Sequence, residues 1–118
     1  MEFNQYNTTV QQWIHTVLEN RETNADVVLE CCRDIIAYGR KTDDPKLMGF
    51  GFFYGGEIYY ELNDGAHFFH MMTEALTYLD RAEEWELVVR CYNFLGIASM
   101  SRGNPSLALD YYMNGLKD

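Results

Sequence analysis

The stretch CYNFLGIASMSRGNPSLALDYY, residues 91–112, joins two apolar runs through a short polar turn and decides the fold. Gly96 lies within the first run, although glycine inside a helix costs about 1 kcal/mol relative to alanine. An Asn-Pro step opens the second run, as is typical of an N-cap followed by the first residue of a helix. A glycine in this place is favourable where the backbone of a partner helix approaches closely. We therefore predict two antiparallel helices, with Gly96 packed against Ala108 or Tyr112.

The same punctuation and the same apolar spacing extend to the rest of the chain. Apolar residues recur at every third or fourth position, and no stretch alternates as a strand does. Pro45 follows a polar Thr-Asp-Asp run, and Asn-Asp-Gly at 63–65 forms a tight turn signal. The pattern predicts an all-α fold in which short connections make successive helices antiparallel neighbours. Six helices are expected, over about residues 7–19, 24–39, 45–62, 66–80, 84–102 and 105–117.

The helices also repeat in pairs. A shift of 40 residues along the chain aligns aromatic and glycine positions: Tyr38 with Tyr78, Phe52 with Tyr92 and Gly56 with Gly96. A period near 40 with two helices per unit is typical of a solenoid of helical hairpins. We interpret residues 1–118 as one domain with repeats at about 7–40, 45–80 and 84–118.

The spacing of aromatic, Leu-Gly, turn glycine, alanine and aromatic in the last unit resembles the signature of the tetratricopeptide repeat (TPR) family. The residues that carry it are Tyr92, Leu95, Gly96, Gly103, Ala108 and Tyr112. The resemblance is clearest over 89–118 and looser over 49–82, where Phe68 replaces the expected small residue and Met72 the expected aromatic. It implies a right-handed solenoid of about three antiparallel hairpins that acts as a non-catalytic protein-interaction module or scaffold.

The helix predicted over 45–62 contains four glycines. Gly55 and Gly56 share a helical face with Phe52, and we interpret this face as the packing face. Gly49 and Gly51 have no such explanation, so this helix is expected to begin late or to fray at its N-terminal end.

In the TPR family, one face of the first helix of each hairpin lines a concave groove. The resemblance places in this groove Trp13, Val17, Phe50, Phe53, Glu57, Tyr60, Glu61, Arg90, Asn93, Ile97 and Met100. Exposed carboxylates at Glu57 and Glu61, beside aromatic residues, suit a basic peptide or partner surface with apolar anchors. The alternative is that Phe50 and Phe53 are core residues. The clamp that some TPR proteins use on acidic tails is not reproduced, because Arg90 and Asn93 lack matching partners.

The last predicted helix carries a second apolar stripe, formed by Leu109, Met113 and Leu116, for which the sequence supplies no covering helix. An exposed stripe of this kind generally marks an interface. Either the chain is cut from a longer array, or two copies form a homodimer through this stripe. The resemblance adds the alternative of a regulatory or oligomerisation segment in a larger bacterial signalling protein, ahead of an output domain such as a diguanylate cyclase.

A metal site is the main chemical alternative. His67, His70 and Glu74 are spaced so that their side chains share one helical face, which suits zinc. A fourth ligand and a longer metal motif are missing, so we predict no metal and no cofactor. Glu57 and Glu61 lie one turn apart but lack a nucleophile or any other catalytic motif, and we predict that the chain is not an enzyme.

Composition excludes several classes of protein. The chain has 118 residues, 47% hydrophobic residues and a net charge of −9, so it can fold but repels the phosphates of nucleic acid and anionic lipid. No apolar run is long enough for a membrane span, and the N-terminus does not resemble a signal peptide. Three cysteines, including the vicinal pair Cys31 and Cys32, form no disulfide framework. These features predict a cytoplasmic protein with reduced thiols.

Overall fold

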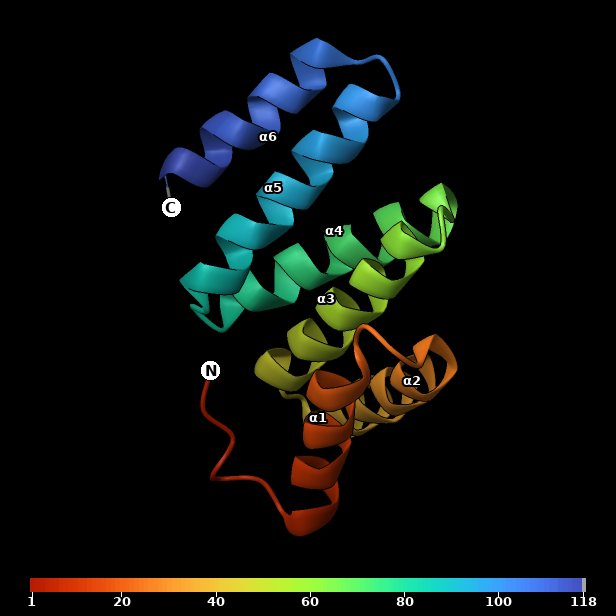
Figure 1. Ribbon diagram of the computed structural model, residues 1–118. Coiled ribbons are helices and arrows are strands. Elements are labelled where there is room, and N and C mark those ends of the chain that lie inside the picture. The colour runs from red at the N-terminus through yellow and green to blue at the C-terminus, as the bar shows by residue number, and fades with distance from the viewer. Residues whose placement is uncertain (118) are drawn as a thin grey trace.

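A computed structural model describes residues 1–117, with the side chain of residue 117 left out of the description. This part of the chain is all-helical, as predicted, and contains no strand. Figure 1 shows six helices joined by short turns. Their bounds are α1 (Thr8–Asn20), α2 (Ala25–Thr42), α3 (Pro45–Glu61), α4 (Gly65–Arg81), α5 (Trp85–Ser101) and α6 (Pro105–Lys117).

The helices follow a regular length rule. From α2 to α6, each begins 20 residues after the one before, at positions 25, 45, 65, 85 and 105. The residue before α2, α3, α4 and α6 accepts a hydrogen bond from a backbone N–H of the first turn, through Asn24, Asp44, Asp64 and Asn104. Such caps satisfy N–H groups that have no partner inside the helix. A helical hairpin therefore repeats every 40 residues, which agrees with the period predicted from the sequence.

The helices pack in chain order. Each of the pairs α1–α2, α3–α4 and α5–α6 forms an antiparallel hairpin, and α2 against α3 and α4 against α5 join one hairpin to the next. Figure 1 shows the hairpins stacked one on another, with α1 and α2 at one end and α6 at the other. The molecule is elongated, with extents of 44 × 28 × 21 Å.

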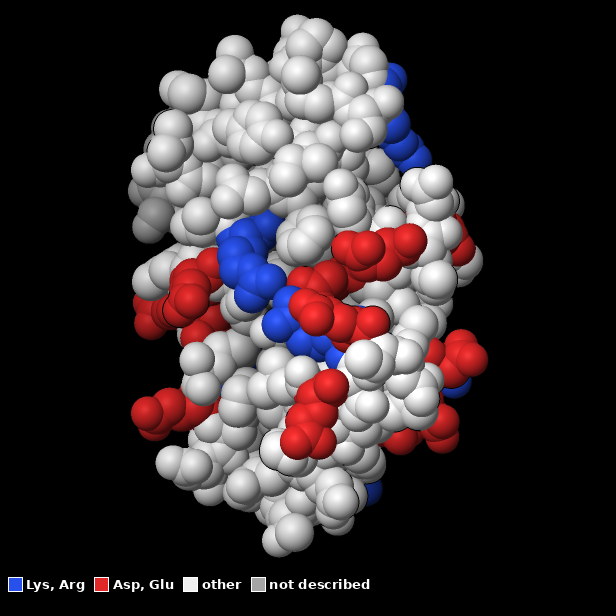
Figure 2. Space-filling view, in the orientation of Figure 1, with Lys and Arg blue, Asp and Glu red and all other residues white. Residues whose placement is uncertain are grey.

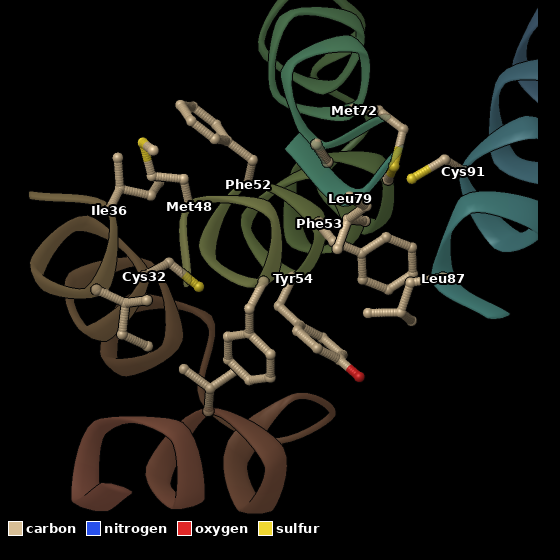
Figure 3. Packing of buried hydrophobic residues seen from close by; sticks show 14 of the residues in the cluster. Cys32, Ile36, Met48, Phe52, Phe53, Tyr54, Met72, Leu79, Leu87 and Cys91 are labelled. Atoms are coloured by element: carbon tan, nitrogen blue, oxygen red, sulfur yellow. The ribbon is translucent and has the colours of Figure 1, made fainter. Parts of the chain in front are cut away.

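The core is centred on α3. This helix lies between α2 on one side and α4 on the other, so side chains around most of its circumference are buried. Figure 3 shows Phe52, Phe53 and Tyr54 leaving α3 in different directions, between the α2 residues and those of α4 and α5. Burial on several sides explains why this helix is apolar nearly all round.

The expectation that α3 begins late or frays is wrong. Gly49 and Gly51 both lie in regular helix, and both are buried at close contacts. A Cβ at Gly49 would lie 2.7 Å from Leu79 Cγ on α4, and a Cβ at Gly51 would lie 2.6 Å from Ile36 Cγ1 on α2. The two glycines therefore allow α3 to approach both of its neighbours.

The opening prediction about Gly96 is confirmed. A Cβ at this position would lie 2.7 Å from Cε1 of the Tyr112 ring, so the glycine makes room for the packing of α6 on α5. Ala108 is also buried on the α6 side.

Candidate functional site: the face of α1, α3 and α5

Two aromatic residues predicted to line the groove belong to the core instead. Phe50 and Phe53 are 1% and 0% exposed, so the expectation that they are accessible to a ligand is wrong and the core alternative is confirmed. The reason is that α3 is packed on several sides: the Phe53 ring meets Phe94 of α5 at 5.9 Å, and Phe50 is covered by Phe3 and Tyr54.

The first helix contributes little accessible surface at its predicted positions. Val17 is fully buried, and Trp13 is half-buried with its ring edge against Tyr38 at 6.3 Å. Tyr60 of α3 is also half-buried, between the rings of Phe68 and Phe94. These aromatic rings support the core beneath the groove.

Glu57 forms the electrostatic centre of this face. Arg21, directly after α1, donates through Nε and Nη2 to the two Glu57 carboxylate oxygens, each at 2.8 Å. Arg90 of α5 lies 3.4 Å from the same carboxylate through its own Nη2. The Glu57 side chain is only 12% exposed, so the expectation that it is a free surface carboxylate is wrong.

Both arginines also lie over aromatic rings. Arg21 Cζ is 5.0 Å from the centre of the Tyr54 ring, and Arg90 Cζ is 4.8 Å from that of Phe53. The hydrogen bonds from Glu57 raise the pKa of Arg21. The prediction that Arg90 lacks a partner is wrong, because one carboxylate on α3 joins the first, second and third hairpins.

The accessible part of this face is polar. Glu61, Asn93 and Ile97 are exposed, as predicted. A pocket of about 540 Å³ opens between the α1–α2 turn and the end of α3, with Glu22 and Glu61 among its lining residues. Figure 2 shows basic residues in the middle of the molecule on this side, bordered by acidic ones.

The N-terminal segment is part of the site and was missed in the sequence analysis. Phe3 packs edge-on against Phe50, with ring centres 5.2 Å apart. Lys46, in the first turn of α3, lies 5.0 Å from the centre of the Phe3 ring. The available signal was that Phe3 and Tyr6 are aromatic although they precede the first helical pattern.

The predicted apolar stripe of α6 is exposed. Leu109, Met113 and Leu116 have exposed fractions of 61%, 51% and 84%. Charge is sparse around them, since residues 91–116 contain only Arg102 and Asp110 as charged residues. Figure 2 shows the part of the face formed by α5 and α6 as almost uniformly uncharged.

The histidines of α4 are engaged separately. His67 Nδ1 lies 2.8 Å from an Asp64 carboxylate oxygen, and its ring stacks on Tyr59, whereas His70 lies edge-on to Phe52. A backbone hydrogen bond from His67, with its side chain, holds the pKa of Asp64 below the usual value. Among the described residues, no three His, Cys, Asp or Glu side chains are placed to hold a metal ion.

We expect zinc to bind without defined stoichiometry. Titration calorimetry of the purified chain should give no saturable tight site, because His67 is oriented by Asp64 and not by a second ligand. The matched measurement uses His67→Ala. One tight site in the wild type that disappears in this variant would contradict the prediction.

The three thiols are free and unsuited to nucleophilic chemistry. Cys32 and Cys91 are buried, and burial raises the pKa of both, to about 12 for Cys91. Burial and the nearby Asp34 and Glu30 also raise the pKa of Cys31. At neutral pH these side chains remain thiols, which are weak nucleophiles.

Comparisons with known proteins add no family. No family model, curated protein or solved structure matches the chain. None of the helices within residues 1–117 is long and apolar enough to cross a bilayer.

Proposed function

We propose that this chain is a non-catalytic protein-interaction module, a short right-handed solenoid of three TPR-like hairpins that binds a peptide or partner surface along α1, α3 and α5. The observation that carries this proposal is the 40-residue hairpin period, together with a polar face to which all three hairpins contribute. The period exceeds the ~34 residues of a TPR unit and lies near the ~40–47 residues of HEAT and armadillo units. The repeat is therefore TPR-like in arrangement, with longer helices.

The chemistry of the groove favours binding over catalysis. Its central carboxylate is paired with two guanidinium groups, and arginine is not deprotonated in proteins, so this cluster offers no general base. Fixed charges over aromatic rings instead provide orientation and specificity for a ligand.

The preferred partner is a segment with a basic residue and an apolar anchor. Glu57 is neutralised by its two arginines, so it does not contribute to the selection of a basic ligand as the sequence indicated. Glu61 and Glu22 remain exposed at the 540 Å³ pocket, and we assign the contact with the basic residue to them.

A random peptide library displayed on phage and selected with the purified chain tests this proposal. We expect the selected peptides to be enriched in lysine or arginine, and Glu61→Lys to weaken their binding at least tenfold by fluorescence anisotropy. Asp34→Lys is the matched control, because Asp34 is an exposed carboxylate on α2. Equal losses in the two variants, or a library without enrichment, would contradict the proposal.

The alternative role is that of a regulatory or oligomerisation segment of a larger signalling protein. It is favoured by the exposed stripe Leu109, Met113 and Leu116, which in a longer array would be covered by the next helix. In the chain as given, a second copy can cover it. The low charge around the stripe reduces the repulsion between two copies that each carry a net charge of −9.

We expect the wild-type chain to sediment as a concentration-dependent dimer, and the double variant Leu109→Glu, Leu116→Glu as a monomer. Two carboxylates in an apolar contact must be desolvated without partners, which opposes association. Leu62→Glu is the control, because Leu62 is a similarly exposed leucine, at 55%, outside α6. If the wild type and the double variant both sediment as folded monomers at high concentration, the stripe is not a dimer interface.

A further inference from the structure

The N-terminal segment, residues 1–6, lies across the face formed by α1, α3 and α5. Figure 1 shows it returning from the start of α1 along the first turns of α3 toward the start of α5. The segment forms no helix, and its one internal turn is closed by the Tyr6 N–H, which donates to the Phe3 carbonyl at 3.2 Å. It therefore occupies the groove in the irregular form of a bound peptide.

Phe3 anchors this segment through its ring. The ring is half-buried and meets Phe50 edge-on at 5.2 Å, a favourable geometry for two aromatic side chains. Phe50 in turn packs on Tyr54 at 4.6 Å, and Arg21 lies over Tyr54. The anchor thus reaches the end of the aromatic and arginine cluster that forms the centre of the site.

Lys46 recognises both the backbone and the ring of the segment. Its Nζ donates a hydrogen bond to the Glu2 carbonyl and lies 5.0 Å from the centre of the Phe3 ring and 5.9 Å from that of Tyr6. These contacts require a backbone carbonyl followed by an aromatic side chain. They do not require any other feature of the Glu2 or Phe3 side chains.

Space for a ligand remains beside the anchor. A pocket of about 180 Å³ is lined by Phe3 together with Leu18 of α1, Tyr54 of α3, and Leu87 and Arg90 of α5. The three first helices of the hairpins therefore meet around the Phe3 ring. A peptide that replaced Phe3 with its own aromatic side chain would contact all three.

We propose that residues 1–6 are an intramolecular ligand of the groove, and that a partner docks as an extended peptide whose aromatic side chain displaces Phe3. This inference rests on the proposed function and adds to it the chemistry of the anchor and a means of regulation. The partner's carbonyl before the aromatic residue takes the hydrogen bond from Lys46. Its basic residue reaches Glu61 and Glu22 at the other end of the face.

Displacement is feasible because the segment is held mainly by side chains. A tethered ligand competes at an effective concentration in the millimolar range. The apparent affinity of the groove for a free peptide falls by the fraction of molecules in which the groove is open. Release of the tethered segment should therefore raise that affinity without any change in the groove itself.

The probe for the test is the heptapeptide MEFNQYN, which corresponds to residues 1–7, added to the full chain and followed by NMR chemical-shift titration. We expect it to bind the Phe3→Ala chain about tenfold more tightly than the wild-type chain, with shifts at Tyr54 and Leu87. Asn4→Ala is the matched control, because Asn4 is exposed in the same segment, and it should behave as the wild type. The same peptide with alanine in place of phenylalanine should not bind Phe3→Ala.

Two outcomes would overturn the inference: equal affinity of the heptapeptide for the wild-type and Phe3→Ala chains, or no binding to either. Peptides selected from the library separate this failure from that of the proposed function. If Glu61→Lys weakens their binding but Phe3→Ala leaves it unchanged, the groove binds partners and residues 1–6 do not regulate it. If the heptapeptide behaves as expected and the library yields nothing, the intramolecular contact stands without the basic partner.

Discussion

Gly51→Ala is expected to lower the free energy of unfolding by about 2 kcal/mol or more, although alanine in place of glycine ordinarily stabilises a helix. The added Cβ would lie 2.6 Å from Ile36 Cγ1 and 3.0 Å from the backbone oxygen of Cys32. Relief of these contacts requires α2 and α3 to separate, because a carbonyl oxygen cannot rotate away as the end of a side chain does. Urea denaturation followed by circular dichroism measures the change.

Gly55→Ala, one turn later in α3, is the matched control. Its Cβ would lie 2.5 Å from the terminal methyl carbon of Met71, and the next contact, with Cys32 Cβ, is at 3.9 Å. The half-buried Met71 side chain can change rotamer, so we expect a change within about 0.5–1 kcal/mol, in either direction. Equal destabilisation by the two variants would show that α2 and α3 are not in close contact at Gly51.

The helix boundaries could be predicted because their causes are local. Each helix after α1 begins after a short polar residue or an acidic residue, two begin with proline, and the turns are brief. These signals act within three or four residues, so a single sequence is sufficient to read them. The contact of Gly96 with Tyr112 was also accessible, because it lies within one hairpin with a short connection.

The environment of α3 could not be predicted in the same way. A helical wheel assigns one packing face, whereas α3 is packed by α2 and α4 and touched by α5 through Phe53 and Phe94. A helix that is apolar nearly all round has no single face to assign. This is why Gly49 and Gly51 remained unexplained, and why Phe50 and Phe53 were placed in an open groove.

The long-range partners were likewise beyond the sequence. Arg21 and Arg90 lie 36 and 33 residues from Glu57, and spacing alone does not show that they meet on one carboxylate. Phe3 lies outside the helical pattern and reaches Phe50 only because the segment folds back across α3. The general location of the face was accessible by register, but its charge balance depends on these tertiary contacts.

The second large effect is expected from Glu57→Lys, which should destabilise the chain by about 2 kcal/mol or more. The substitution leaves three cationic side chains at one largely buried point, and Arg21 loses both of its 2.8 Å hydrogen bonds to the carboxylate. Removal of one partner from a fully buried pair costs about 3–5 kcal/mol. The value here is smaller, because the side chains of Arg21 and Arg90 are 30% and 38% exposed and water screens part of the repulsion.

Glu61→Lys separates this structural role from the charge reversal itself. Glu61 lies one turn from Glu57 on α3 but is exposed, so its reversal should change stability by no more than about 0.5 kcal/mol. Thermal and urea unfolding of the two variants, measured side by side, decide the question. If both are nearly neutral, Arg21 and Arg90 are not held by Glu57 in solution, and the carboxylate is available to a basic ligand after all. If only Glu57→Lys is destabilising, Glu57 links the three hairpins, and recognition of a basic partner falls to the exposed carboxylates around it.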